Sequence, residues 1–199
     1  MKLIFIGPQG SGKGTQAKII ANKLNLEHIS AGDLLRSATG ELKKEIESHI
    51  NFGNFVPDKL ILKLLKQKLD RTNNFILDGF PRNITQVKEL DKITKIDKII
   101  EIEISDSEAI KRLSSRISCE KCGESYNLMT NPPKQKNICD KCKTKLTQRK
   151  DDTPESIKKR LEIYHKETEP ILKNYPSIKI NGEQKIKDVT GDILKELEK

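Results

Sequence analysis

Tryptophan is absent from this chain of 199 residues, and aromatic residues make up only 4% of it. The core must therefore consist mostly of Ile and Leu side chains. No stretch approaches the roughly 20 apolar residues of a membrane-spanning helix, so we expect no membrane partner. The apolar run of residues 1–6 stops at Gly7. It is too short for the hydrophobic part of a secretory signal peptide, and we expect a cytoplasmic protein.

A dense basic segment is also missing, although the formal net charge is +9. An excess of positive charge is compatible with nucleic-acid binding. Proteins that bind single strands, however, interleave basic residues with aromatic ones, and this chain does not. Its lysines are scattered among acidic residues. We expect a lysine-rich surface around a site for small anions, and no nucleic-acid partner.

Short apolar segments alternate with amphipathic ones along most of the chain. Strands are expected at 2–6, 74–78, 97–104 and 177–180, and helices at 13–24, 58–70, 105–116, 154–170 and 185–198. This alternation predicts a parallel sheet covered by helices on both faces. Residues 30–56, mostly helical and polar, and residues 117–150, which hold the cysteines, interrupt the alternation. We interpret both as insertions into one core.

A glycine-rich loop, Gly7-Pro-Gln-Gly-Ser-Gly-Lys-Gly-Thr15, connects the first predicted strand to the first helix. The backbone N–H groups of such a loop point toward a phosphate, and the following helix adds the positive end of its dipole. Lys13 would reach the β- and γ-phosphates. The threonine comes two positions after the lysine, so its hydroxyl is not expected to bind magnesium directly. The alternative, a tight turn with a surface lysine, does not account for the position between strand and helix.

Arginine is rare, with 7 residues among 38 basic ones. Its planar guanidinium binds phosphate in a bidentate manner that lysine does not reproduce. Arg82 ends the segment Asp78-Gly-Phe-Pro-Arg82, just past the carboxyl end of a predicted strand, where α/β sheets bind ligands. Surface salt bridges are the alternative, and they suit Arg71 well. The other six lie in or beside loops and insertion boundaries, which favours a phosphate site: Arg36, Arg82, Arg112, Arg116, Arg149 and Arg160.

The four cysteines form two Cys-x-x-Cys pairs, Cys119/Cys122 and Cys139/Cys142, with sixteen residues between them. This spacing is typical of a four-thiolate zinc site, and four protein ligands make the metal structural rather than catalytic. About 30 polar residues cannot build a core of their own, so zinc would supply much of the folding energy of this segment. A redox role would not need two matched pairs, and none of the three histidines has ligand spacing to another.

Together these motifs resemble the adenylate kinase family, in particular its bacterial members with a long zinc-bearing lid. The resemblance covers essentially the whole chain. It rests on Gly7 to Thr15, Ser30-Ala-Gly-Asp-Leu-Leu-Arg36, Asp78-Gly-Phe-Pro-Arg82 with Gln86, Arg112 with Arg116, Arg149-Lys-Asp-Asp152, and Arg160. It implies an α/β fold, a P-loop doubly wound parallel sheet. Residues 1–29, 57–114 and 153–199 would form the core domain, 30–56 the insertion that binds the nucleoside monophosphate, and 115–152 the zinc-binding lid.

The resemblance also implies roles for individual residues. Catalytic roles fall to Lys13, Arg82, Arg116, Arg149 and Arg160. ATP would contact Gly10, Ser11, Gly12, Lys13, Gly14, Thr15, Arg112, Arg116, Ser125, Tyr126 and Gln184. AMP would contact Ala31, Arg36, Asn54, Phe55, Val56, Gly79, Phe80, Pro81, Arg82, Gln86, Arg149 and Arg160. Asp33 and Asp78 would orient magnesium through its waters, Asp151 and Asp152 would join the lid to the core, and Cys119, Cys122, Cys139 and Cys142 would bind zinc.

The implied reaction is reversible phosphoryl transfer from Mg·ATP to AMP, giving two ADP, by a monomer with Mg²⁺ and a structural Zn²⁺. Ala31 and Asn83 also occur in the related UMP/CMP kinases, which have short lids and usually lack a glutamine at the position of Gln86. The cysteine-bearing lid and Gln86 favour AMP. A UMP/CMP kinase on the same fold is the first alternative, and a zinc-ribbon ATPase that binds nucleic acid is a more distant one.

Overall fold

The computed structural model describes residues 1–50, 56–149 and 151–199. Its central sheet has five parallel strands in the order β2-β3-β1-β4-β7. These strands are β1 (Lys2–Ile6), β2 (Glu27–Ser30), β3 (Phe75–Asp78), β4 (Lys98–Glu103) and β7 (Ser177–Asn181). The chain builds outward from β1 in both directions, which is the doubly wound arrangement that the alternation predicts. A ligand site is expected at the carboxyl ends of the strands, where the order reverses.

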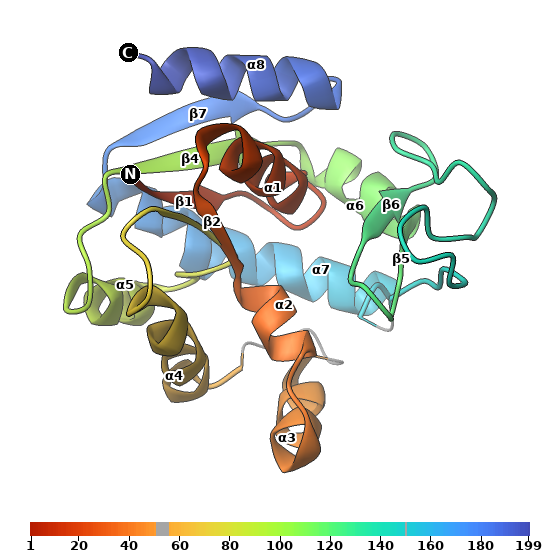
Figure 1. Ribbon diagram of the computed structural model, residues 1–199, viewed down its shortest axis with the longest axis horizontal. Coiled ribbons are helices and arrows are strands. Elements are labelled where there is room, and N and C mark those ends of the chain that lie inside the picture. The colour runs from red at the N-terminus through yellow and green to blue at the C-terminus, as the bar shows by residue number, and fades with distance from the viewer. Residues whose placement is uncertain (51–55, 150) are drawn as a thin grey trace.

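Helices cover the sheet on both faces, with α8 and α7 on opposite sides of it (Figure 1). The helices are α1 (Lys13–Leu24), α2 (Ala31–Arg36), α3 (Gly40–Ile50), α4 (Asp58–Leu69), α5 (Ile84–Asp91), α6 (Asp106–Ser114), α7 (Pro154–Ile163) and α8 (Ile186–Leu197). A π-helical turn, Tyr164–Thr168, and a 3₁₀ helix, Glu169–Asn174, continue α7. Among the described residues, no helix is long and apolar enough to cross a membrane.

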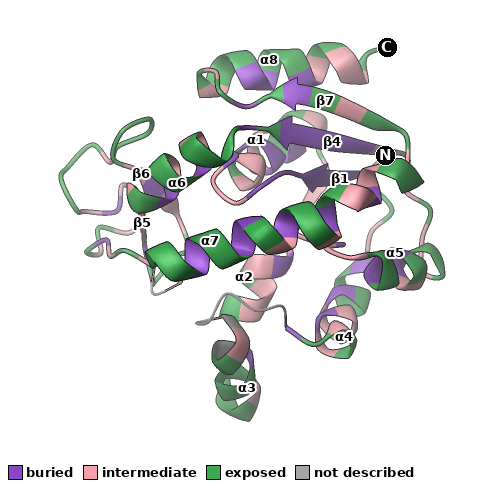
Figure 2. Ribbon diagram, turned by 180° about the vertical axis from the view of Figure 1, so that it is seen from behind, coloured by how far each residue is buried: buried purple, intermediate pink, exposed green. Residues whose placement is uncertain are grey.

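Side chains of β1 alternate between two separate cores. Leu3 and Phe5 pack with α1 and α8, whereas Ile4 and Ile6 pack with α4 and α5. In a parallel sheet that is buried on both faces, each strand has a nearly continuous apolar sequence. This is why apolar and polar residues do not alternate over residues 2–6. Figure 2 shows β1 and β4 in the colour of buried residues, between α7 and α8, whose outer faces are exposed. The two cores are rich in Ile and Leu, as the scarcity of aromatic residues predicts.

Two elements of the core were not predicted from the sequence. Strand β2 is a four-residue edge strand whose only fully buried residue is Ile29, so it lacks a recognisable apolar run. Helix α5 begins after Asn83, whose Oδ1 accepts a hydrogen bond from the backbone N–H of Gln86 at 2.8 Å. The expected helix to residue 170 was too long, because α7 ends at Ile163 and changes to π-helical geometry.

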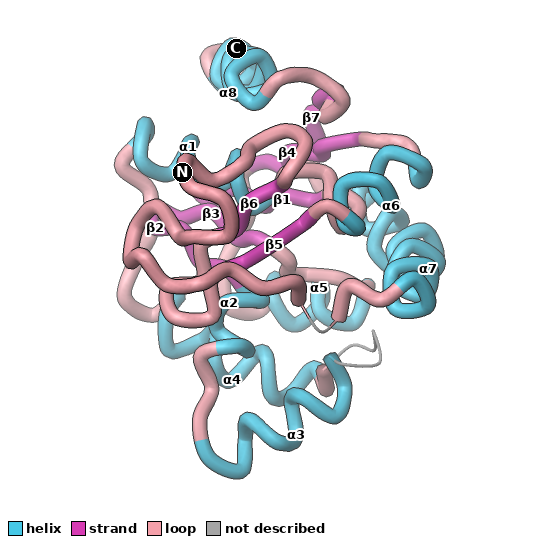
Figure 3. Tube along the Cα trace, turned by 90° about the vertical axis from the view of Figure 1, so that its right-hand side faces the viewer, coloured by secondary structure: helices cyan, strands magenta, loops and turns pink. Residues whose placement is uncertain are grey.

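Residues 116–149, which contain the four cysteines, fold beside α6 as a small unit with its own short hairpin. We call it the cysteine unit. Strands β5 (Arg116–Ser118) and β6 (Ser125–Asn127) pair antiparallel. The buried interior of this unit consists of Cys119, Tyr126, Cys139 and Leu146. Figure 1 shows the hairpin at one end of the molecule, and Figure 3, viewed from that end, shows it in front of the parallel sheet. So small an apolar interior is what we expect of a segment that is predicted to take much of its folding energy from a bound metal.

Candidate active site

A cleft of about 1250 Å³ opens above the carboxyl ends of the strands, between the glycine-rich loop, α2 and the cysteine unit. Most residues of the expected site line it. They are Gly10 to Thr15, Ala31, Asp33, Arg36, Val56, Asp78, Gly79, Phe80, Arg82, Gln86, Arg112, Arg116, Ser125, Tyr126, Arg149, Arg160 and Gln184. Pro81 does not line the cleft and borders a small void of about 20 Å³ beside Lys13 and Arg82. Asn54 and Phe55 lie outside the described residues.

The glycine-rich loop turns from β1 into α1 with its N–H groups at the cleft. Gly12 is the N-cap of α1 and has φ of 91°, a conformation that a residue with a side chain rarely adopts. A Cβ on Gly14 would lie 2.9 Å from Asp78 Oδ2, so glycine allows the carboxylate to approach the loop. Ser11 Oγ is buried without a hydrogen-bond partner in the described part of the chain. A buried polar atom of this kind requires a partner, and a phosphate oxygen in the loop would supply one.

Lys13 lies half-buried on the floor of the cleft, and its Nζ donates to the backbone oxygen of Pro8 at 3.2 Å. Desolvation lowers the pKa of Lys13 to about 8, against the raising effect of Asp78. The positive charges of Arg82, Arg116 and Arg160 lower this pKa further. An anion bound among these cations would reverse that trend and stabilise the protonated amine.

Asp152 joins two arginines that are far apart in the sequence. Arg116 donates to both carboxylate oxygens, with Nε–Oδ2 at 2.7 Å and Nη2–Oδ1 at 2.6 Å. Arg160 Nη2 donates to Asp152 Oδ1 at 2.8 Å, and Arg160 Nη1 donates to Asp151 Oδ2 at 3.0 Å. Burial alone would raise the pKa of Asp152, but hydrogen bonds from Arg116 and Arg160 lower it. The carboxylate therefore stays ionised and connects the start of the cysteine unit to α7.

Arg149 has no hydrogen bond or ion pair with any described residue. Desolvation lowers its pKa to about 10, and the nearby charges of Arg116 and Arg36 act in the same direction. Arg82 is also desolvated, which lowers its pKa, and its Nε donates to the Gly79 backbone oxygen at 2.7 Å. The centre of the cleft thus holds more positive charge than its carboxylates neutralise. Such an excess creates a site for a highly charged anion.

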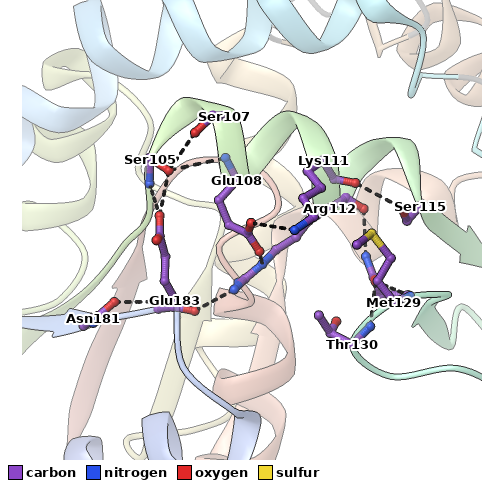
Figure 4. A network of polar contacts seen from close by, with 12 residues as sticks. Ser105, Ser107, Glu108, Lys111, Arg112, Ser115, Met129, Thr130, Asn181 and Glu183 are labelled. Atoms are coloured by element: carbon purple, nitrogen blue, oxygen red, sulfur yellow. Dashed lines mark hydrogen bonds and ion pairs between the residues drawn. The ribbon is translucent and has the colours of Figure 1, made fainter.

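Arg112 is held at two points at the mouth of the cleft (Figure 4). Its Nε donates to Glu108 Oε1 at 2.8 Å, and its Nη2 donates to the backbone oxygen of Gly182 at 3.0 Å. The side chain of Glu183 binds the backbone N–H and hydroxyl of Ser105, at 2.8 Å and 2.7 Å. These contacts connect the N-terminus of α6 with the loop after β7. The guanidinium is therefore fixed in place before any ligand arrives.

Asp78 ends β3 next to the loop and faces His28, with 3.8 Å between Asp78 Oδ2 and His28 Nε2. Burial would raise the pKa of Asp78, but interactions with His28, Lys13 and Arg82 lower it. An ionised carboxylate near the loop fits water-mediated magnesium binding. Asp33, the second expected residue, pairs with Arg36 through Oδ1 and Nη2 at 2.6 Å.

The sulfur atoms of Cys119, Cys122, Cys139 and Cys142 all lie within 4.8 Å of one another. Sγ–Sγ separations are 3.3 Å for Cys119–Cys142, 3.5 Å for Cys122–Cys139 and 3.6 Å for Cys122–Cys142. A tetrahedral site with Zn–S bonds of about 2.3 Å places its sulfurs ~3.8 Å apart, so this group fits zinc. Hydrogen bonding with Thr144 lowers the pKa of Cys142 to about 6. Against a lowering backbone hydrogen bond at Glu124, burial and the neighbouring thiols raise the pKa of Cys122 to about 12.

Tyr126 borders both the cleft and the cysteine group. Its hydroxyl lies 3.6 Å from Cys139 Sγ and accepts a hydrogen bond from the backbone N–H of Asp140 at 2.8 Å. The ring is therefore fixed by the cysteine unit, with its polar end turned toward the sulfurs. Glu124, two residues earlier, pairs with Lys18 of α1 at 2.8 Å and with Lys141 at 2.7 Å. The ion pair between Glu124 and Lys18 connects the unit to the core.

Sequence reasoning missed several residues that line the cleft. They include Lys18, His28, Glu108, Glu124, Asn127 and Met129. Glu108 precedes Arg112 by four positions on one helix, and this spacing alone signals an ion pair. Lys18, His28 and Glu124 carry no such local signal, because their partners come from distant segments.

Comparison with known proteins gives a consistent assignment. The adenylate kinase family model matches residues 5–180. The chain is 40% identical to an adenylate kinase of Caldicellulosiruptor saccharolyticus, covering 99% of both chains. It is 43% identical to one of Petrotoga mobilis, covering 98% of this chain and 96% of the relative. For one of Borrelia turicatae the identity is 46%, covering 96% and 94%. Together with the geometry of the cleft, these matches show that the chain belongs to the adenylate kinase family.

Proposed function

We propose that the cleft binds ATP on the glycine-rich loop and AMP opposite it, and that the central arginines stabilise the phosphoryl group in transit. The reaction of the family is reversible phosphoryl transfer from ATP to AMP. One observation carries the assignment of the site: five cationic side chains line the same cleft, namely Lys13, Arg82, Arg116, Arg149 and Arg160. That excess of positive charge matches the charge of two facing phosphate chains.

On the ATP side, residues 10–15 would hold the phosphates, with Lys13 at the β- and γ-positions. Arg112 would stack on the adenine, since its guanidinium is already fixed by Glu108 and Gly182. Ser125, Tyr126 and Gln184 would flank the same nucleotide. This half of the site lies between the loop and the cysteine unit, which supports the assignment of residues 115–152 as a lid.

On the AMP side, Arg36 and Arg82 would bind the phosphate, and Gln86 would read the adenine edge. Ala31, Val56, Gly79 and Phe80 border the same part of the cleft. Pro81 would act by shaping this segment, since it lies behind the cleft wall. The predicted contributions of Asn54 and Phe55 remain part of the proposal, as does the assignment of residues 30–56 as the monophosphate-binding segment.

Two metals belong to the proposal. Asp33 and Asp78 would hold Mg²⁺ through its waters, and the metal would neutralise charge on the ATP phosphates. The four cysteines would hold a structural Zn²⁺. A monomeric state and a cytoplasmic location remain predictions from the sequence.

The reaction needs little general acid–base catalysis, because the AMP phosphate is already an anion and can attack directly. The side chains instead align the two phosphates and neutralise charge on the transferring oxygens. This explains why arginines dominate the site while His28 only borders it. Movement of the lid and of residues 30–56 over the bound nucleotides would exclude water, which otherwise competes with AMP as the acceptor.

The substrate assignment is tested by offering AMP, CMP, UMP and GMP separately with Mg·ATP and measuring ADP formation. We expect strong turnover with AMP and weak turnover with the others. Preference for CMP or UMP would support the alternative raised by Ala31 and Asn83, which neither the family match nor the relatives favour. Turnover independent of any acceptor, with salt-sensitive nucleic-acid binding, would support the zinc-ribbon alternative.

The pH dependence of kcat/KM for ATP should report the ionisation of Lys13. This parameter reflects the free enzyme, in which the lysine has a pKa of about 8. As pH rises through 8 the ammonium is lost, so kcat/KM should fall on the alkaline side. Bound phosphates raise the same pKa, so the fall in kcat should occur at higher pH. Coincident alkaline limbs for both parameters would contradict this interpretation.

A further inference from the structure

Gln86 lines the cleft, but a residue outside the cleft holds its amide. Gln86 Nε2 donates to Asp58 Oδ1 at 2.6 Å, and Gln86 Oε1 accepts from the backbone N–H of Arg82 at 2.7 Å. Asn83 Nδ2 reaches the same Asp58 oxygen at 3.4 Å. Gln86 is only 3% exposed, so these neighbours determine how its amide is oriented.

Asp58 is well placed to act as a fixed acceptor. It is the first residue of α4, where a negative charge interacts favourably with the helix dipole. Ile61 and Leu65 anchor the same helix in the core that contains Val87 and Leu90 of α5. The carboxylate therefore connects two helices whose relative position is already set by packing.

The chemistry of the two partners permits a single orientation of the Gln86 amide. The Asp58 carboxylate only accepts hydrogen bonds, and the Arg82 N–H only donates one. A rotated amide would place Gln86 Oε1 against the carboxylate and Nε2 against the N–H, both repulsive. The orientation present leaves one N–H and one oxygen lone pair of Gln86 for a ligand in the cleft.

We propose that Asp58 is a positioning residue that, through Gln86, selects nucleobases carrying an amino group next to an unprotonated ring nitrogen. Adenine and cytosine present this donor–acceptor pair, and the fixed amide complements it. Guanine and uracil present a carbonyl next to a ring N–H, which is the reverse pattern and would require the amide to rotate. The inference rests on the proposed role of Gln86 at the AMP base, and assigns discrimination against GMP and UMP to a residue outside the cleft.

The test compares Asp58→Ala and Asp58→Asn with the unaltered full chain in steady-state kinetics with AMP, GMP and UMP. Removing the acceptor should raise KM for AMP about tenfold and lower the AMP:GMP and AMP:UMP ratios of kcat/KM about tenfold, while KM for ATP stays unchanged. Asp58→Asn keeps a carbonyl acceptor and should stay within about threefold of the unaltered chain. Asp188→Ala is the matched control, because Asp188 is an exposed acid in the first turn of α8.

Unchanged KM for AMP and unchanged acceptor ratios in Asp58→Ala would overturn the proposal. So would equal increases in KM for ATP and AMP, since these indicate general loosening of the fold. If Asp58→Ala does not fold, Asp58→Ser replaces it, because the shorter side chain keeps a polar group at the helix start without reaching Gln86. An unaltered chain that does not phosphorylate AMP would instead refute the proposed function, and this inference with it.

Discussion

Arg149→Lys is expected to lower kcat by about 10³-fold without loss of thermal stability. Arg149 has no ion pair among the described residues, and desolvation together with Arg116 and Arg36 lowers its pKa. Asp151 and Asp152 offset its charge only in part, and bound phosphates would compensate the rest. Lysine keeps the charge but not the planar pair of donors that a transferring phosphoryl group engages. Steady-state kinetics and a thermal unfolding curve of the same preparation measure both effects.

Arg71→Lys is the control, because Arg71 is exposed on the surface and away from the cleft. It should leave kcat and the unfolding midpoint unchanged. Arg116→Lys should also lower kcat, but with a loss of stability, since it weakens the bidentate pair with buried Asp152. Near-normal turnover in both Arg149→Lys and Arg116→Lys would refute the assignment of the two arginines to the reacting centre.

Cys139→Ser is expected to abolish stoichiometric zinc binding and to lower both thermal stability and activity. Cys139 is fully buried in a small hydrophobic cluster with Cys119, Tyr126 and Leu146. Each kcal/mol lost shifts the unfolding midpoint of a chain of this size by about 2–4 °C, so a shift of several degrees should be seen. Because the proposed lid, residues 115–152, contains Arg149, loss of its order should reduce kcat by as much as about 10²-fold.

Elemental analysis of protein prepared without chelator should show about one zinc per unaltered chain and none in the variant. Lys121→Ser, an exposed change within the first Cys-x-x-Cys pair, is the matched control and should retain the metal. If the unaltered chain contains no zinc, the proposal that the four cysteines hold a structural Zn²⁺ is wrong. Full zinc content in Cys139→Ser would exclude Cys139 as a ligand.

Much of this fold follows from local sequence patterns. The buried strands are recognisable in the sequence as short apolar runs. The amphipathic helices α4 and α8 are recognisable because their apolar residues recur at helical spacing. Strand β2 does not, since a short edge strand with one buried residue has no period to detect. Its position depends on pairing with β3, which is a property of the assembled sheet.

Local sequence patterns also predict some parts of the candidate site and not others. The glycine-rich loop and the cysteine pairs were predictable, because the groups that act together lie close in sequence. The resemblance implied that Asp152 joins the lid to the core, but not that Arg116 and Arg160 are its partners. The fixing of Gln86 by Asp58 was not predicted. These contacts join residues on different elements, and their partners are chosen by packing rather than by spacing. The sequence therefore predicts which side chains line the cleft better than it predicts what orients them.

The two ion pairs of Glu124 have a consequence for kinetics. If the lid swings away from α1, the contact with Lys18 breaks, but the contact with Lys141 travels with the lid and keeps the carboxylate paired. Loss of the Lys18 contact therefore leaves no unpaired acid, and a partly exposed salt bridge of this kind contributes only about 0–1 kcal/mol. Because mobile ions screen such a contact, product release should become faster as ionic strength rises. Glu124 would thus link the duration of the closed state to the salt content of the surroundings.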